Sequence, residues 1–300
     1  MSGILAILNT DGAPVDADLV PRLTTCMADR GPDGHSTWVN GAVGLGHTAF
    51  HTTVEAASEE QPLSFDGQVW LNAYARIDDR TELRRQLTAA GCAVPPGATD
   101  PDFILHAYHT WGPACLDHLL GDFAFIIWDA REQRLFCARD HFGIRPFFYA
   151  QVGDTLIVGN TLSCVRRHPV VPQDLDDLAI ADFLLFGAYQ DPELTAYAAI
   201  RRLPPGHSLI WEGDALRIEP YWSLPVEEPL WYANKDDYVA QFGELFTAAV
   251  VDRLRTSRIA ISMSGGLDST AVAAVAADHL NLDSDKYALW AYTNGYTRLI

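Results

Sequence analysis

The chain has few basic residues. Among its 300 residues, 21 are Lys or Arg and 39 are Asp or Glu, which gives a formal net charge of -18. Proteins that bind a nucleic-acid backbone rely on clustered Lys and Arg to neutralise its phosphates. The composition therefore argues against a nucleic-acid partner, tRNA included.

Long apolar runs and cysteine pairs are also missing. No stretch is long enough to span a bilayer, and residues 1–8 lack the basic start of a signal peptide, so we expect no membrane partner. The cysteines are odd in number and contain no Cys-x-x-Cys pair, which argues against a zinc site and a disulfide framework. We therefore predict a cytoplasmic protein. The five are Cys26, Cys92, Cys115, Cys137 and Cys164.

The most informative stretch is residues 258–270. A short apolar run is followed by a hydroxyl- and glycine-rich turn and then by an alanine-rich segment, which predicts strand, phosphate-binding loop and helix. Gly265 and Gly266 lack the Cβ atoms that would keep a phosphate from the backbone, and Ser264 and Ser269 add hydroxyls beside the amides of a helix N-terminus. The pattern indicates an anion site.

Asp268 in this stretch points to a metal-bound nucleotide. A carboxylate beside a phosphate site repels the ligand unless a divalent cation lies between them, which predicts ATP with Mg²⁺. The stretch is not the kinase-type P-loop, because the Gly-Lys-Ser/Thr of that motif is absent. For Ser264-Gly265-Gly266 alone, an ordinary loop before a helix is the alternative.

The six residues 264–269 resemble the pyrophosphate-binding loop of the N-type ATP pyrophosphatases, enzymes that cleave ATP to AMP and pyrophosphate. The resemblance implies that the whole string contacts nucleotide and that Asp268 faces the metal. Met263 and Thr293 end two predicted strands and are expected near the adenine. The string is Ser264, Gly265, Gly266, Leu267, Asp268 and Ser269.

Hydrophobic periodicity predicts alternating strands and helices elsewhere. Strands are expected at 3–8, 43–50, 69–75, 119–128, 135–138, 146–150, 208–211, 216–218 and 287–293. Helices are expected at 17–30, 102–111, 175–186, 236–255 and 270–280. In Arg139-Asp140-His141 a catalytic His-Asp pair is not expected, because adjacent residues on a strand face opposite sides and cannot act together without a bend.

Five motifs then resemble, in order, the glutaminase domain of the glutamine-hydrolysing asparagine synthetase family. They are Ser2-Gly3-Ile4, Arg30-Gly31-Pro32-Asp33-Gly34, Leu45-Gly46-His47, Gly121-Asp122-Phe123-Ala124-Phe125 and 138–146. The resemblance implies an α/β protein. An N-terminal-nucleophile-hydrolase-like αββα sandwich is expected at 2–165, a connecting hairpin and linker at 166–235, and the start of a doubly wound parallel-sheet domain at 236–300. Since such a sheet needs more than two strands, we expect the second domain to be truncated.

The chain departs from this family at the expected glutaminase residues. Ser2 stands where the family has a nucleophilic cysteine, and Ala49 stands where the family has an arginine that clamps the glutamine carboxylate. Asn72 keeps the oxyanion position, but Ala73 and Tyr74 follow it in place of Gly-Glu. Asp100 keeps the position that binds the glutamine amine. Loss of a bidentate clamp removes about 1.5–3 kcal/mol of binding, so we expect an inactive glutaminase pocket; a working serine amidotransferase is the alternative.

By resemblance the protein is an ATP-dependent ligase that activates a small-molecule or peptide carboxylate as an acyl-adenylate and joins it to an amine. Residues 78–80 and 292–300 are similar to β-lactam synthetases and lasso-peptide cyclases, in which the substrate itself carries the amine. Conventional asparagine synthesis from glutamine or ammonia is the alternative. A third possibility is a non-catalytic protein that binds a nucleotide or a partner protein. A homodimer or a biosynthetic partner protein is expected.

Overall fold

The computed structural model describes residues 1–226, 229–280 and 288–293. The chain forms two compact units, Met1–Leu224 and Pro225–Ile300. Within the described ranges, no helix has both the length and the apolar character needed to cross a bilayer.

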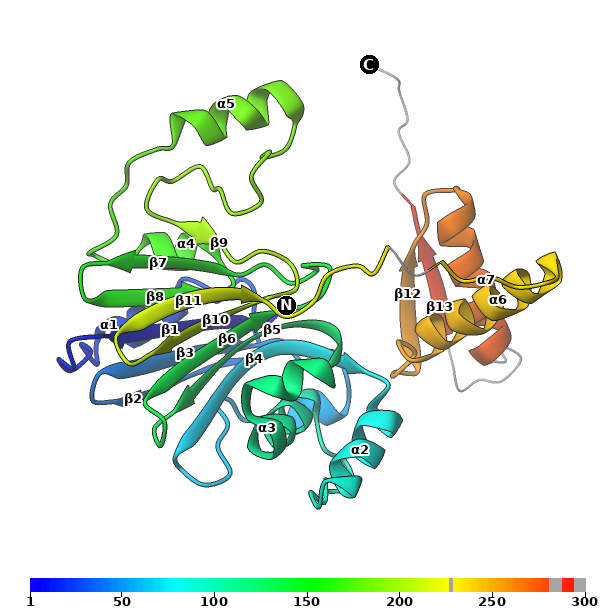
Figure 1. Cartoon of the computed structure of the whole chain (residues 1–300), viewed down its shortest axis with the longest axis horizontal. Helices are drawn as coiled ribbons and strands as arrows, with labels where there is room; N and C mark the ends of the chain where they lie inside the picture. Colours follow the sequence, from blue (N-terminus) through cyan, green and yellow to red (C-terminus); the bar gives the residue numbers. More distant parts are fainter. Residues whose placement is uncertain (227–228, 281–287, 294–300) are drawn as a thin grey trace. The chain divides into compact units, whose positions relative to one another are not determined.

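The first unit begins with a six-stranded sheet of order β2-β3-β1-β8-β7-β9 (Figure 1). Each strand is antiparallel to its neighbours, and residue Ile4 of β1 pairs with His47 of β3. The strands are β1 (Gly3–Asn9), β2 (Gly34–Asn40), β3 (Val43–Ala49), β7 (Phe148–Val152), β8 (Thr155–Gly159) and β9 (Arg201–Arg202).

A five-stranded antiparallel sheet of order β11-β10-β6-β5-β4 forms the second layer. Its long strand β5 is buried along most of its length, which explains its continuous apolar sequence. The strands are β4 (Val69–Asp78), β5 (Leu120–Asp129), β6 (Arg134–Arg139), β10 (His207–Glu212) and β11 (Ala215–Pro220).

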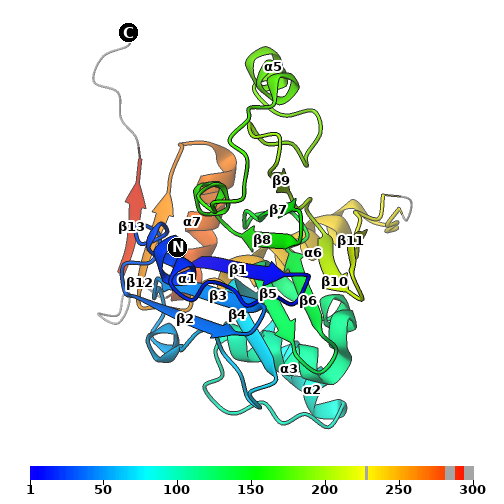
Figure 2. The same ribbon diagram turned by 90° about the vertical axis from the view of Figure 1, so that its left-hand side faces the viewer.

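Strand alternation builds three cores from these two sheets. On β1, Ile4 points into the core between the sheets, whereas Leu5 points into the core under α1 and α4. On β5, Ala124 joins the core between the sheets, and Phe123 joins a third core with Phe103 of α3. The result is the αββα sandwich expected from the sequence, with α2 and α3 beside the second sheet (Figure 2). The helices are α1 (Leu19–Thr25), α2 (Arg80–Ala89), α3 (Asp100–Trp111) and α4 (Leu162–Arg166).

The first helix is shorter than the predicted range 17–30. From Cys26 onward, backbone amides bond to the carbonyl three residues earlier, so tight turns replace the helix. The apolar stripe is nevertheless buried, since Leu19, Leu23 and Met27 all lie in the core. The sequence patterns also failed to predict β2, α2 and β8, together with the short 3₁₀ turns η1 (Glu55–Ser58) and η2 (Gly112–Asp117).

Residues 166–224, expected to connect two domains, lie within the first compact unit. The predicted hairpin forms as β10 and β11, and β10 pairs with β6 of the second sheet, so the hairpin extends that sheet. The predicted helix at 175–186 forms as α5 (Asp177–Phe186), capped by the side chain of Asp176. The expected linker includes residues 227 and 228, which lie outside the described residues.

Arg139 and Asp140 bind backbone groups around the turn that follows β6. The Arg139 guanidinium donates hydrogen bonds to the carbonyls of Arg145, Leu203 and Gly143. The carboxylate of Asp140 accepts the amides of Phe142, Ile144 and Arg145, which fixes the turn after β6. Both charges are therefore used to hold backbone.

The second unit contains α6 (Lys235–Val251), β12 (Arg258–Ser262), α7 (Leu267–Leu280) and β13 (Ala288–Tyr292). Strands β12 and β13 are parallel, with Ala260 beside Trp290, and α7 lies between them in the chain. This strand-helix-strand order is the unit from which doubly wound sheets are built. Residues 294–300, part of the cyclase-like stretch, lie outside the described residues.

Candidate functional site

Ser2 lies between Met1 and the first residue of β1. Its hydroxyl accepts a hydrogen bond from the Phe50 amide at 3.1 Å, and its carbonyl accepts one from the Asn160 side chain at 2.9 Å. The pKa of the Met1 α-amino group is lowered to about 6 by burial and by the nearby Arg30 and Arg145. While Met1 is attached, the nitrogen of Ser2 is a peptide amide and cannot act as a base.

Asn72 lies in the middle of β4 with its side chain between the sheets, fully buried. Its amide nitrogen donates to the carbonyls of Gly46 (2.8 Å) and Leu5 (3.3 Å), and its oxygen lies 2.8 Å from Nδ1 of His47. Burial lowers the pKa of His47 to about 4, which keeps its ring neutral. Both donors of Asn72 are thus used by backbone oxygens.

Asp100 begins α3 and lies against the start of α2. Its carboxylate accepts the Ile77 amide at 2.8 Å, and Arg80 donates to the same oxygen from Nε (2.9 Å) and Nη2 (2.7 Å). Arg80 also pairs with Glu55 at 3.2 Å. The charge of Asp100 is therefore compensated by a side chain of this protein.

Two further contacts lie beside Asn72 on β4. The Ala73 amide, on the open edge of the strand, donates to Oε1 of Gln61 at 2.6 Å. The ring of Tyr74 is stacked against Arg145, whose guanidinium carbon lies 3.9 Å from the ring centroid, and Arg145 also donates to the Tyr74 hydroxyl. The groups that follow Asn72 on the strand are thus bound by Gln61 and Arg145.

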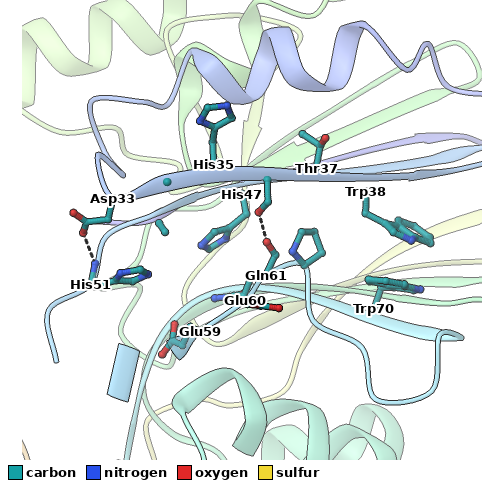
Figure 3. Close-up of a pocket in the computed structure, with 14 residues that line it drawn as sticks. Asp33, His35, Thr37, Trp38, His47, His51, Glu59, Glu60, Gln61 and Trp70 are labelled. Atoms are coloured by element: carbon teal, nitrogen blue, oxygen red, sulfur yellow. Dashed lines mark hydrogen bonds between the residues drawn. The ribbon is translucent and has the colours of Figure 1, made fainter. Parts of the chain in front are cut away.

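A pocket of about 500 Å³ opens between strands β2 and β3 and the segment 59–62 (Figure 3). Ala49, at the expected clamp position, is one of its lining residues. Burial is the main cause that raises the pKa of Glu59 to about 7, and the charges of Asp100 and Asp102 add to the increase. None of the described residues that line the pocket is Lys or Arg.

The predicted phosphate loop follows β12 in the second unit; its residues 264–266 precede α7, and its residues 267–269 form the first turn of α7. Gly265 has a backbone φ of +80°, which favours glycine, and a Cβ at this position would meet no other atom within 4 Å. The Ser264 amide donates to Oγ of Ser269 at 3.2 Å, and the Gly266 amide donates to Oγ of Ser264 at 3.3 Å. The loop is largely exposed and includes the first turn of α7, where helix amides have no intrahelical partner.

The residues of this loop are suited to a magnesium-bound nucleotide. Asp268 lies in the first turn of α7 and is exposed. Mg²⁺ in nucleotide sites is held by one or two carboxylates together with phosphate oxygens, so Asp268 fits the metal and the loop hydroxyls fit the phosphates.

Met263 and Thr293 follow the last residues of the two parallel strands. The Met263 amide donates to the carbonyl of Tyr292, the last residue of β13, at 2.7 Å. Thr293 comes directly after Tyr292 and is exposed. The structure thus brings Met263, Thr293 and the loop with Asp268 to the same end of β12 and β13.

Both units match known sequence families. Residues 1–222 match the family described as "Glutamine amidotransferase domain", and residues 241–297 match "Asparagine synthase". The chain belongs to the glutamine amidotransferase family. The fold is similar to that of a glutamine phosphoribosylpyrophosphate amidotransferase of B. subtilis, which superposes with a TM-score of 0.53 at 15% identity, over 97% of this chain and 65% of that one.

Several relatives of this glutamine amidotransferase family member are named asparagine synthetases. "Asparagine synthetase [glutamine-hydrolyzing] 3" of Bacillus subtilis is 31% identical over 92% of this chain and 45% of its own length. A putative asparagine synthetase of Mycobacterium bovis is 29% identical over 99% of this chain and 48% of its own length. "Amidase chyE" of Penicillium rubens is 28% identical over 84% of this chain and 37% of its own length. The chain spans about half the length of the curated relatives it matches.

Two contact residues of this amidotransferase domain, Arg80 and Gln61, were not predicted from the sequence. Arg80 is the first residue of α2, and that helix had a detectable signal, since Asp79 and Glu82 have the spacing of a helix N-cap. The Asp79 side chain does accept the Glu82 amide, at 3.3 Å. Gln61 had no such signal, because its role depends on the fold bringing its side chain to the edge of β4.

Proposed function

We propose that the protein is an ATP-dependent amide-forming ligase of the asparagine synthetase family whose glutaminase pocket is inactive. The observation that carries this proposal is the ion pair between Arg80 and Asp100. By resemblance Asp100 is the residue that would bind the α-ammonium group of glutamine. An arginine bound to this carboxylate competes with that ammonium for the carboxylate charge.

The other expected glutaminase groups support the same proposal. Both Asn72 donors are bound to backbone carbonyls, and the Ala73 amide is bound to Gln61, so the donors beside the oxyanion position already have partners. Stabilising a developing oxyanion requires donors aimed at it and free to bind it. Ala49 provides no charge for the glutamine carboxylate. Ser2 adds a hydroxyl where the family uses a more acidic thiol.

We infer that the second unit binds ATP through residues 264–269, with Asp268 toward Mg²⁺, which would neutralise phosphate charge. The loop amides and hydroxyls would hold the pyrophosphate portion and stabilise it as a leaving group. A substrate carboxylate would then attack the α-phosphorus, giving an acyl-adenylate and pyrophosphate. Attack of an amine on the acyl carbon would form the amide and release AMP.

The amine in this proposal belongs to the substrate, as in β-lactam synthetases and lasso-peptide cyclases. An inactive glutaminase pocket provides no ammonia, and this favours a cyclase-type ligase acting on a small-molecule or peptide carboxylate. A conventional asparagine synthetase is the second candidate. The names of the relatives from B. subtilis and M. bovis and the retained Asn72 and Asp100 favour it.

Two measurements on the protein test the proposal. Exchange of labelled pyrophosphate into ATP, with candidate carboxylates present, reports adenylation. Release of glutamate from glutamine reports glutaminase activity. The proposal expects exchange with a carboxylate other than aspartate and no glutamate release. A glutamine-using asparagine synthetase expects exchange with aspartate together with glutamate release, an ammonia-using one expects exchange with aspartate alone, and a non-catalytic binding protein gives neither exchange nor glutamate.

A further inference from the structure

The pocket between β2, β3 and the segment 59–62 has a one-sided charge. Asp33, Glu59 and Glu60 contribute carboxylates to its lining, and among the described lining residues there is no Lys or Arg to balance them. Asp33 is held by the His51 amide at 2.7 Å. A carboxylate or phosphate ligand would be repelled here, whereas a cation would be attracted.

Glu59 is a carboxyl whose ionised form is poorly compensated. Its pKa is raised to about 7 by burial and by Asp100, Asp102 and Glu55, while the charge of Arg80 acts in the opposite direction. Arg80 is itself bound to Asp100 and Glu55. A ligand cation entering the pocket would therefore stabilise the ionised form of Glu59, which the protein alone disfavours.

The other end of the pocket is aromatic. The rings of Trp38 and Trp70 are stacked with centroids 4.6 Å apart, and in Figure 3 they lie at the end opposite Asp33 and Glu59. Pro62 also lines the pocket. Indole faces offer a large apolar contact surface and attract cations.

We propose that this pocket binds a primary ammonium group attached to an apolar or aromatic body, with the ammonium at Glu59 and Glu60 and the body against Trp38 and Trp70. Glutamine fits less well, because its carboxylate would find no cationic side chain at Ala49. A metal ion is a poorer occupant, since the described residues contain no group of three or more His, Cys, Asp or Glu that could hold one. The pocket lies wholly within the first unit, so this inference does not depend on the ATP chemistry.

Calorimetric titration of the purified chain with three matched probes tests the charge requirement. 2-Phenylethylamine, 2-phenylethanol and 3-phenylpropionate share a phenyl body and differ in charge. The amine should bind at least tenfold more tightly than the alcohol, and the acid should show no binding. Equal affinity for amine and alcohol, tighter binding of the acid or of L-glutamine, or no binding of the amine at millimolar concentration overturns the proposal.

Two variants test the position of the site. Glu59→Gln and Glu60→Gln should each weaken amine binding about tenfold, the order expected for one partly exposed charge-assisted contact. Glu219→Gln is the control. Glu219 lies on β11, an edge strand of the second sheet, and does not line the pocket, so the same charge change there should leave the affinity unaltered. Circular dichroism checks that each variant is folded. If folded Glu59→Gln and Glu60→Gln bind the amine as tightly as the unmodified chain, the site assignment is wrong.

Discussion

The guanidinium of Arg80 lies 2.7 Å from the carboxylate of Asp100, and both side chains are largely buried. The pair joins the first residue of α2 to the first residue of α3. Removing one partner of a buried pair leaves the other charge without compensation, which costs more than the pair contributes when intact. The ion pair therefore links the starts of α2 and α3.

Replacing Arg80 with methionine should therefore destabilise the first unit. We expect a loss of about 2 kcal/mol, less than for a fully buried pair because both side chains keep some exposure. This loss of unfolding free energy can be measured by urea denaturation monitored by circular dichroism. Arg85→Met is the matched control on the same helix: Arg85 pairs with Glu82 on the surface, and the midpoint should not move. A midpoint unchanged in Arg80→Met would show that the pair is not structural.

Stability should also depend on pH through Glu59. Its pKa is about 7 in the folded protein against an ordinary value of 4.5, so between these values the folded state binds more protons than the unfolded state. The unfolding free energy contributed by Glu59 therefore falls as pH rises from 4.5 to 7. Glu59→Gln should gain on the order of 2 kcal/mol over the unmodified protein at about pH 8 and nothing at about pH 4.

Comparing Glu59→Gln with the unmodified protein removes the contribution that His47 makes to the pH dependence of stability. Burial lowers the pKa of His47 from 6.5 to about 4, so its contribution to stability is lost as pH falls through this range, opposite in direction to that of Glu59. The difference between the unfolding free energies of the two proteins, measured at several pH values, cancels this contribution. A difference that does not change with pH would contradict the assignment to Glu59.

Asn72→Ala should cost about 2–4 kcal/mol of stability, because the substitution leaves the carbonyls of Leu5 and Gly46 and Nδ1 of His47 without this buried partner. Asn40→Ala, at an exposed position of β2, should change stability little. Thermal unfolding of the two variants gives the comparison, and similar melting temperatures would mean that the Asn72 network contributes little.

Ser2→Cys alone should not create a glutaminase. The thiol restores the nucleophile of the family, but Arg80 remains on Asp100, Gln61 remains on the Ala73 amide, and Ala49 remains without charge. Glutamate release should stay at background in the full-length variant, measured by coupled oxidation of glutamate. Alkylation of the variant by iodoacetamide controls for access to the thiol. Glutamine turnover by this single substitution would show that the pocket is intact.

Sequence patterns predicted most of the fold, and physical causes account for the exceptions. Strands β1, β3, β4, β5 and β6 were found because their apolar residues fill a core on one or both faces. Strand β2 was missed because it is an edge strand with mostly polar, exposed residues. The first helix was predicted too long, since the buried stripe of Leu23 and Met27 continues through turns that are no longer helical.

The candidate site was predictable to a lesser extent. The loop 264–269 is a local motif, and the structure has it after β12 as expected, although the helix begins at Leu267 rather than at 270. The departures at Ser2, Ala49 and Tyr74 could be read by resemblance. The contacts of Gln61 with β4 and of Arg80 with Asp100 join residues 12 and 20 positions apart through tertiary packing, and no pattern within one segment contains that information.

The most direct test of the account is to measure pyrophosphate exchange and glutamate release in one preparation of the full-length protein. We predict exchange that is lost in Asp268→Asn and kept in Asp278→Asn, an exposed carboxylate on the same helix, with no glutamate released from glutamine in any of the three proteins. Glutamate release by the unmodified protein, or exchange that survives Asp268→Asn, would contradict it.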